Sequence, residues 1–287
     1  MKTILILGSG GMLGSMVNWW LAQCPNRDSY RIINHLRSTA SPLSAKHYIT
    51  CDVTMETASF LMKEIQLRKP DYIINCIGVI KPQMKNTVNA IFINSVFPHY
   101  LCKSNPNSRV IHVTTDCVFD GGVQTAGADE SIPHSAKDDY GKSKSLGEPN
   151  EYNCLNLRTS IIGPEIRNCY SLIESVRKNA GGVMEGYMHH WWNGVTTLTL
   201  AKLMGDIIDR DWFKGNHTRH VSMHEPINKF ELVTAINDRY NLNIKITAVK
   251  AANAVDRSIR TLHRDEMYNE FIAKIPNIQA QLNDLPF

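Results

Sequence analysis

The sequence predicts an α/β protein that is built on a parallel β-sheet. Through the first half of the chain, short runs rich in β-branched residues alternate with stretches of helical spacing, which is the pattern of strand–helix–strand units. Residues 71–77 form a continuous apolar run, as expected of a strand that helices cover on both faces. The chain has 287 residues, of which 43% are apolar and 20% charged, so it can form a sizeable core.

The predicted elements follow one another in a regular order. The first strand covers residues 4–7 and leads into a helix over residues 12–23, which Cys24-Pro25-Asn26 ends. We expect the other strands of this half at residues 31–34, 48–51, 71–77, 109–114 and 154–158. We expect the other helices at residues 54–68, 88–103, 140–146 and 196–209. Pro98 lies inside the helix over residues 88–103 and is expected to kink it.

Beyond about residue 160 the alternation of strands and helices loosens. We therefore predict two units, a sheet domain over residues 1–165 and a smaller lobe over residues 166–287, with some segments of the lobe interleaved with the first domain. The sequence contains no internal repeat, low-complexity tract or Pro/Ser-rich linker.

Composition excludes several classes of protein. The formal charge is only +4 and no basic run forms an arm or stripe, so a nucleic-acid backbone binder is not expected. The seven cysteines form no CxxC pair, which argues against a disulfide framework and a thiolate zinc site, and reduced thiols in the cytoplasm are the economical interpretation. His189 and His190 are adjacent rather than spaced for a shared metal ion, so we expect no metal site. The first apolar run is too short for a secretory signal, and no run is long enough for a membrane span.

A glycine loop directly follows the first strand and opens the first helix. Gly8, Gly11 and Gly14 fall at GxxGxxG spacing in this loop. Glycines there allow a tight turn and close approach of the backbone to a pyrophosphate, which the free N–H groups of the helix N-terminus then face. The loop predicts a dinucleotide site whose first residues are Gly8, Gly11, Met12, Leu13 and Gly14.

The residues after the second strand favour NADP(H) over NAD(H). An NAD-binding chain usually places Asp or Glu about 20 residues past the glycine loop, whereas this chain has Arg37 and Ser38, which can hold a 2′-phosphate. The alternative is that Arg37 is a solvated loop charge. Asp52 could accept a hydrogen bond from the adenine amino group or cap the next helix. The predicted cofactor site also includes Val53, Cys76, Gly78, Tyr140 and Lys144.

One tyrosine–lysine pair has the spacing of a catalytic pair. Tyr140 is the only tyrosine with a lysine four residues later, so Tyr140 and Lys144 share a helix face. Thr115 follows a predicted strand, whose carboxyl end would border the same crevice as the glycine loop. A phenol with a pKa near 10 needs a stabilised phenolate to act near neutral pH, and we expect the Lys144 ammonium to supply that stabilisation. Thr115 would hold a carbonyl oxygen while Tyr140 donates a proton. Asn94 is a candidate for supporting Lys144 through a water, or a packing residue.

Four stretches carry a resemblance to a known family. The segments GSGGMLG, TTDCVFDG, YGKSK and LRTSIIGPE resemble the extended short-chain dehydrogenase/reductase superfamily, and within it the dTDP-4-dehydrorhamnose reductase-like nucleotide-sugar reductases. The similarity runs from Met1 to about Arg210. It implies a Rossmann-type doubly wound parallel sheet with a smaller C-terminal substrate lobe. It also implies NADPH-dependent reduction of the keto group of a 4-keto-6-deoxy nucleotide sugar, in deoxysugar or polysaccharide precursor synthesis. The family's catalytic threonine, tyrosine and lysine correspond to Thr115, Tyr140 and Lys144.

The chain also departs from this family. Cys117 stands where the family commonly has Tyr, which reshapes that wall of the site. Related dehydratases follow the equivalent Thr with an Asp-Glu pair, whereas Asp116 here precedes Cys117, so dehydration is not expected. The segment from Trp191 resembles the family's substrate-lobe loop. The predicted substrate contacts are Cys117, Arg158, Trp192 and Asn193.

Two of these substrate contacts have open alternatives, and so does the activity. The tryptophans could stack on a nucleotide base or pack the lobe against the sheet, and Arg158 could reach a diphosphate or form a structural ion pair. An epimerase, a dual epimerase/reductase and a non-catalytic NADP-binding regulatory subunit also fit the motifs. The oligomeric state is open, with a homodimer as one option.

Overall fold

The computed structural model describes residues 1–38, 48–166 and 169–287, and its centre is a seven-stranded parallel sheet. The strand order is β11-β6-β5-β4-β1-β2-β3, and every neighbouring pair runs parallel. The strands are β1 (Lys2–Leu7), β2 (Tyr30–Leu36), β3 (Tyr48–Thr50), β4 (Tyr72–Asn75), β5 (Arg109–Thr115), β6 (Cys154–Thr159) and β11 (His217–His220). The predicted α/β class with a doubly wound parallel sheet is confirmed.

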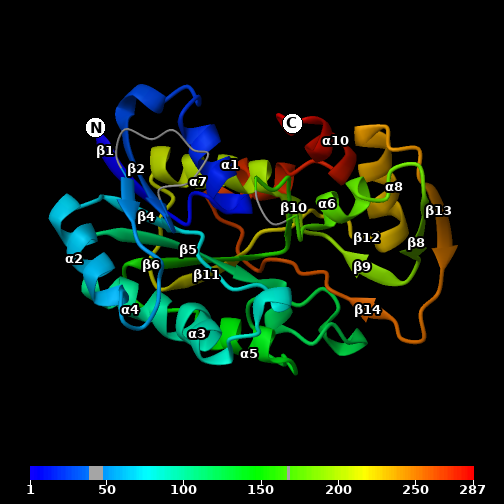
Figure 1. Ribbon diagram of the computed structural model, residues 1–287, viewed down its shortest axis with the longest axis horizontal. Coiled ribbons are helices and arrows are strands. Elements are labelled where there is room, and N and C mark those ends of the chain that lie inside the picture. The colour runs from blue at the N-terminus through cyan, green and yellow to red at the C-terminus, as the bar shows by residue number, and fades with distance from the viewer. Residues whose placement is uncertain (39–47, 167–168) are drawn as a thin grey trace.

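Helices cover both faces of this sheet (Figure 1). Along β1, Ile4 and Ile6 face the core cluster that contains residues of α1 (Met12–Leu21) and α7 (Thr197–Asp209). Leu5 and Leu7 face the opposite cluster, which contains residues of α2 (Ala58–Arg68) and α4 (Phe97–Ser104). Because successive strand residues point to opposite faces, a strand with a helix layer on each side must be apolar throughout.

The chain order places a crevice beside β1. The strands after β1 extend the sheet in one direction through β2 and β3, and the chain then returns to lay β4 on the other side of β1. The connections that leave the carboxyl ends of β1 and β4 therefore diverge. Ligands of open parallel sheets bind in the crevice that such a divergence leaves.

The helix expected over residues 88–103 is interrupted. It consists of α3 (Thr87–Ile91), a π-helical turn at Phe92–Val96 and α4, with Pro98 in the first turn of α4. A proline is tolerated in a first turn because its missing N–H has no partner there, so the departure from α-helix geometry lies before Pro98. The helix expected from residue 54 begins at Ala58, after a turn in which Thr54 and Thr57 bond each other.

The rest of the chain forms short elements beside the sheet (Figure 1). Three small sheets pair β10 (Val195–Thr196) with β7 (Ile161–Ile162), β13 (Lys245–Val249) with β8 (Val183–Tyr187), and β9 (His190–Trp192) with β12 (Ile227–Asn228) and β14 (Val255–Asp256). The remaining α-helices are α5 (Asp139–Leu146), α6 (Leu172–Arg177), α8 (Lys229–Tyr240), α9 (Glu266–Glu270) and α10 (Ile278–Asn283). Short 3₁₀ turns occur at Arg27–Ser29, Lys81–Gln83, Asp116–Val118, Val123–Thr125 and Ile272–Lys274.

Two elements from beyond residue 165 belong to the central body. The helix α7 packs on α1, and β11 pairs with β6 at the sheet edge. The division of the chain at residue 165 stays a prediction. None of the described helices is long and apolar enough to cross a membrane.

Candidate active site

The glycine loop joins β1 to α1 in a turn that two of its glycines make possible. Gly8 has a φ of +75°, in the left-handed region that disfavours side chains. A Cβ on Gly14 would lie 2.2 Å from the carbonyl oxygen of Gly8, so only glycine lets the helix approach the loop this closely. The Gly11 N–H donates to the Gly8 carbonyl at 2.9 Å, and α1 begins at Met12. The first N–H groups of α1 thus emerge at the crevice.

A cavity of about 420 Å³ lies at this edge of the sheet. Its walls come from the glycine loop, from the segments that follow β4 and β5, and from α5. The predicted cofactor and catalytic residues that line it are Gly11, Met12, Leu13, Arg37, Cys76, Gly78, Thr115, Tyr140 and Lys144, and Cys117 lines it as well. Predicted residues that do not line it are Gly8, Gly14, Ser38, Asp52, Val53, Arg158, Trp192 and Asn193.

The end of β2 is tied to the glycine loop by a residue that the sequence analysis did not single out. His35 is buried, its Nδ1 accepts from the Gly8 N–H at 3.3 Å, and its Nε2 lies 2.9 Å from the Cys51 carbonyl oxygen. Burial lowers the pKa of His35 to about 4, so the ring is neutral and Nε2 carries the proton. One imidazole therefore joins the ends of β1, β2 and β3.

The residues after β2 and β3 differ in what they can offer a cofactor. Arg37 is exposed and pairs with Asp52 at 3.3 Å, an exposed ion pair that contributes little to stability and can open for a phosphate. Ser38 is exposed, whereas Val53 is buried in the core beneath α2. Val53 therefore contributes apolar packing beside the site.

The predicted catalytic residues meet at one wall of the cavity. The helix α5 starts at an N-cap, where the Asp138 carboxylate accepts from the Gly141 N–H at 2.8 Å. Lys144 lies on α5 and its Nζ donates to the carbonyl oxygen of Val113 on β5 at 3.0 Å. Thr115 ends β5, where its hydroxyl donates to the Asp116 carboxylate at 3.1 Å, and it lines the same cavity as Tyr140.

Burial dominates the electrostatics of these groups. It raises the pKa of Tyr140, which Cys117 raises further and the hydrogen bond with Thr115 lowers. Burial thus acts against the expected acidity of the phenol, and the stabilisation of the phenolate by Lys144 stays a prediction. Burial also lowers the pKa of Lys144 to about 8, and the charge of Glu148 opposes that shift. A phenol that stays protonated at neutral pH is in the state that a proton donor requires.

The two cysteines in the wall are neutral thiols. Burial raises the pKa of Cys76 and the pKa of Cys117 to about 12. Since the thiolate is the reactive form, neither is suited to act as a nucleophile near neutral pH. Cys117 offers a small, weakly polar surface beside Thr115, where its own backbone N–H donates to the Thr115 hydroxyl at 3.2 Å.

Asn94 holds the segment after β4 in place. Its side chain accepts from the Val79 N–H at 2.8 Å and donates to the Val79 carbonyl at 3.0 Å and to Ser143 Oγ at 3.1 Å. These bonds tie the π-helical turn to α5 and to Val79 in the cavity wall. The expected support of Lys144 through a water stays a prediction.

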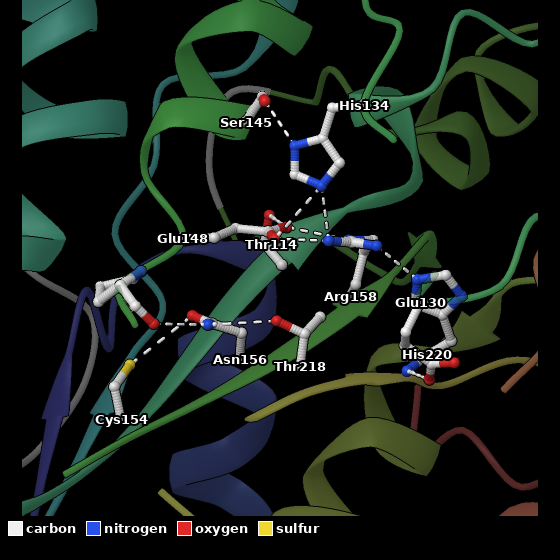
Figure 2. Close-up of polar contacts among 11 residues, drawn as sticks. Thr114, Glu130, His134, Ser145, Glu148, Cys154, Asn156, Arg158, Thr218 and His220 are labelled. Carbon is white, nitrogen blue, oxygen red and sulfur yellow. Dashed lines mark hydrogen bonds and ion pairs between the residues drawn. The ribbon is translucent and has the colours of Figure 1, made fainter. Parts of the chain in front are cut away.

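Arg158 and Asn193 are corrected as candidates for substrate contact. Arg158 is buried and forms an ion pair with Glu148, so the structural alternative holds (Figure 2). The Asn193 amide donates to the Met223 and Ile259 carbonyls at 3.0 and 2.8 Å, and its oxygen accepts from the Ile259 N–H at 3.0 Å. The polar groups of both side chains are therefore bonded to partners inside the protein.

The two adjacent tryptophans lie in different environments, Trp192 against the core and Trp191 at the surface. Trp192 packs against the main core cluster, and a Cβ on Gly194 would lie 2.4 Å from its ring. Trp191 is 38% exposed. The structure thus supports the packing alternative for Trp192. Within the described residues, no three His, Cys, Asp or Glu side chains gather as a metal site.

Further residues line the cavity that the sequence analysis did not assign to it. They are Gly10, Ile77, Val79, Ile80, Gln83, Val113, Thr114, Asp116, Thr159, Ser160, Ile161, Glu165 and Tyr170. Many of them follow the carboxyl ends of β4, β5 and β6, and that position along a predicted parallel strand is the signal that could have found them.

A family model and curated relatives match this chain. The model described as "RmlD substrate binding domain" matches residues 1–285. The dTDP-4-dehydrorhamnose reductase of Mycobacterium tuberculosis is 27% identical over 157 residues, which is 51% of this chain and 44% of the relative. The match thus spans less than half of the relative's length.

Solved structures share the fold over nearly the whole chain. A dTDP-4-dehydrorhamnose reductase from Bacillus anthracis in complex with NADP has a TM-score of 0.77 at 18% identity and covers 99% of this chain and 98% of its own. The Bordetella bronchiseptica enzyme WbmH in complex with NAD⁺ has a TM-score of 0.77 at 14% identity and covers 99% and 97%. At these identities the likeness shows the Rossmann-type fold.

Proposed function

The chain belongs to the RmlD substrate binding domain family, and from that premise we propose that it is an NADPH-dependent reductase of a nucleotide sugar. The substrate we propose is the keto group of a 4-keto-6-deoxy sugar nucleotide, as in the dTDP-4-dehydrorhamnose reductases that it resembles. One observation carries the proposal: Thr115, Tyr140 and Lys144 line the same cavity as the glycine loop. A proton donor and a dinucleotide cradle are what ketone reduction needs in one place.

The described residues fit a phosphorylated dinucleotide. The pyrophosphate would meet the N–H groups at the start of α1, where the Gly14 position leaves no room for a side chain. Arg37 lines the cavity, and its exposed pair with Asp52 leaves the guanidinium available for a 2′-phosphate. The NADP-bound relative supports the same choice. When bound, the reduced nicotinamide supplies the hydride.

Side chains of this protein would bind the ketone oxygen of the substrate and protonate it. Tyr140 is protonated at neutral pH because burial raises its pKa, so its hydroxyl can donate to the ketone oxygen as negative charge develops there. Thr115 lies beside Tyr140 and would hold the same oxygen. The Lys144 ammonium would stabilise the phenolate that remains.

We also propose the arrangement and setting that go with this activity. Residues 1–165 would bind the cofactor and residues 166–287 would form most of the substrate lobe, with Cys117 on the wall between them. The free cysteines of the described chain suit the reducing cytoplasm. Asp116 is followed by Cys117 rather than Glu, so sugar dehydration is not proposed.

The first prediction tests the role of Tyr140. Tyr140→Phe removes the proton donor and leaves the ring, so ketone reduction should fall at least about 100-fold while NADPH still binds. The measurement is NADPH absorbance loss with dTDP-, UDP- and GDP-linked keto sugars, alongside NADPH binding by fluorescence. Undiminished turnover in the variant would refute the assignment.

The same experiment separates the alternatives. An epimerase changes the sugar, as product NMR would record, without consuming NADPH stoichiometrically. A regulatory subunit binds NADPH and turns over none of the sugars. Either result would replace the reductase.

A further inference from the structure

A buried ion pair lies behind the strand that carries Thr115. Glu148 lies two residues beyond the end of α5, and its carboxylate accepts from Arg158 Nε at 3.0 Å and from Arg158 Nη2 at 2.5 Å. Both side chains are more than nine-tenths buried, with 8% and 4% exposure. Figure 2 shows the pair between the end of α5 and strand β6. A buried, bidentate pair of this kind holds its two elements at a defined distance.

Neutral imidazoles surround the arginine. Arg158 donates to His220 Nε2 and to His134 Nε2, both at 2.7 Å, and a guanidinium can only donate. The other ring nitrogen, Nδ1, therefore carries the proton in each histidine, and it donates to the Arg260 carbonyl from His220 and to Ser145 Oγ from His134. Burial lowers the pKa of both histidines. Glu148 is thus the anion that balances Arg158.

Glu148 also reaches the catalytic strand. The Thr114 hydroxyl donates to Glu148 Oε1 at 2.9 Å, and Thr114 is the neighbour of Thr115. Two consecutive residues of β5 are therefore attached to α5 or to the segment just beyond it. The Val113 carbonyl accepts from the Lys144 ammonium, and the Thr114 hydroxyl donates to Glu148.

The charge that faces Lys144 comes from Glu148. Lys144 is buried, and the Glu148 carboxylate beyond the end of α5 favours its charge. The Tyr140 phenol, which lines the same cavity, is neutral. From β5 Lys144 is faced by His112, whose pKa burial and Lys144 hold well below the usual range, so that ring is neutral too. Among the described residues around Lys144, Glu148 is therefore the group that favours its charged form.

We propose that Glu148 is a positioning residue of the active site, which fixes α5 against β5 through Thr114 and supplies the counter-charge of the Lys144 ammonium. The inference rests on the proposed function for the roles of Tyr140 and Lys144. If Lys144 must be charged to stabilise the phenolate, activity falls as pH rises through the pKa of Lys144. Removing the Glu148 charge lowers the pKa of Lys144, so the loss of activity with rising pH then begins at a lower pH.

The test replaces Glu148 by glutamine, which keeps the size and one accepting oxygen and removes the charge. The ε-carbon of Lys144 is followed by NMR against pH in protein carrying ¹³C-labelled lysine, with its signal assigned by its loss in Lys144→Arg. In Glu148→Gln we expect the titration midpoint to fall by about one pH unit, and the alkaline limb of the kcat/KM profile to move with it.

Thr114→Val is the matched control, because it removes the hydroxyl bond and keeps the carboxylate. We expect it to lower kcat at every pH and to leave the Lys144 midpoint where it is in the wild type. If Glu148→Gln does not fold, the double variant Glu148→Gln/Arg158→Met removes both buried charges. It should still lower the midpoint, but by less than the single variant, because the loss of the Arg158 cation partly offsets the loss of the Glu148 anion.

The NMR midpoint keeps this inference distinct from the proposed function. An unchanged midpoint in the folded Glu148 variant would overturn the inference, whatever happens to turnover. A shifted midpoint would support it even if the wild-type protein reduced none of the keto sugars, a result that would count against the reductase alone.

Discussion

His35 illustrates how a single side chain can shape a cofactor site without lining it. Its ring accepts from Gly8 and donates to Cys51, which are 27 and 16 residues away along the chain. Arg37, two residues later, projects into the cavity that this contact helps to form. The sequence indicated Arg37 because the usual acidic residue is missing, but it contained no signal for His35, whose partners are set by strand pairing.

At this scale we predict that Arg37 discriminates between the two dinucleotides. Arg37→Ala removes the cation proposed to hold the 2′-phosphate, so NADPH should bind about 10- to 100-fold more weakly, as expected for a lost charge-assisted hydrogen bond. NADH affinity should change little. Fluorescence titration with both dinucleotides checks this, and Arg31→Ala, exposed at the other end of β2, is the control. Equal weakening of both dinucleotides would mean that Arg37 does not contact the phosphate.

At the scale of elements, close approaches decide which helices can reach the site. The helix α1 meets the glycine loop at Gly14, and the segment between α5 and Glu148 meets the π-helical turn at Gly147, where a Cβ would lie 1.7 Å from the Asn94 carbonyl oxygen. Both contacts are with backbone, which cannot move aside as a flexible side chain can. The π-helical turn therefore has a packing role against α5.

We predict that Gly14→Ala disables cofactor binding by moving α1. The new Cβ would lie 2.2 Å from the Gly8 carbonyl oxygen, so the loop and helix must separate, at a cost of about 1–3 kcal/mol in unfolding free energy. NADPH affinity should fall together with stability, as measured by fluorescence titration and urea unfolding.

Gly181→Ala is the control for that substitution, since a Cβ there meets nothing within 4 Å. It should lower stability only by the strain of its left-handed backbone, about 1–2 kcal/mol, and leave NADPH binding intact. An unaffected NADPH affinity in Gly14→Ala would show that the close approach of α1 is not needed for the cofactor.

At the scale of the whole molecule, several histidines are buried as neutral rings. His35 and His220 have their pKa lowered to about 4 by burial, and burial lowers the pKa of His112 further. In the unfolded chain these histidines become protonated near pH 6.5, whereas in the folded chain they stay neutral down to about pH 4. The folded chain therefore becomes less stable relative to the unfolded chain as the pH falls through this range.

We predict that the free energy of unfolding is nearly constant between about pH 7 and 8, below the range in which the buried Lys144 and the buried thiols titrate, and falls steadily between about pH 6.5 and 4. Each buried histidine contributes about 1.4 kcal/mol per pH unit in that window. Urea unfolding at several pH values measures the slope. His35→Asn should reduce this slope. The exposed His224→Gln should not, because His224 lies at the surface of the folded chain. A stability that is flat down to pH 4 would contradict the burial of these rings.

Local pattern made much of the fold predictable. Short apolar runs and helical spacing depend on neighbours along the chain, so six of the seven strands of the central sheet and most of its helices were predicted within a few residues. The same holds for the glycine loop and for Tyr140 and Lys144, whose spacing places them on one helix face. The edge strand β11, which is largely polar (His217–His220), was not predicted. A second exception was residues 88–103, where packing against α5 and the cavity wall accompanies a π-helical turn.

The sequence by itself determined the α/β class, the glycine loop and the tyrosine–lysine pair, because each depends on residues that are close along the chain. Only the tertiary structure decided which polar side chains stay free for ligands. Arg158 and Asn193 looked available in the sequence, yet folding sets buried partners opposite both. A polar side chain taken out of water must find such a partner, and the partner's identity depends on contacts between distant segments.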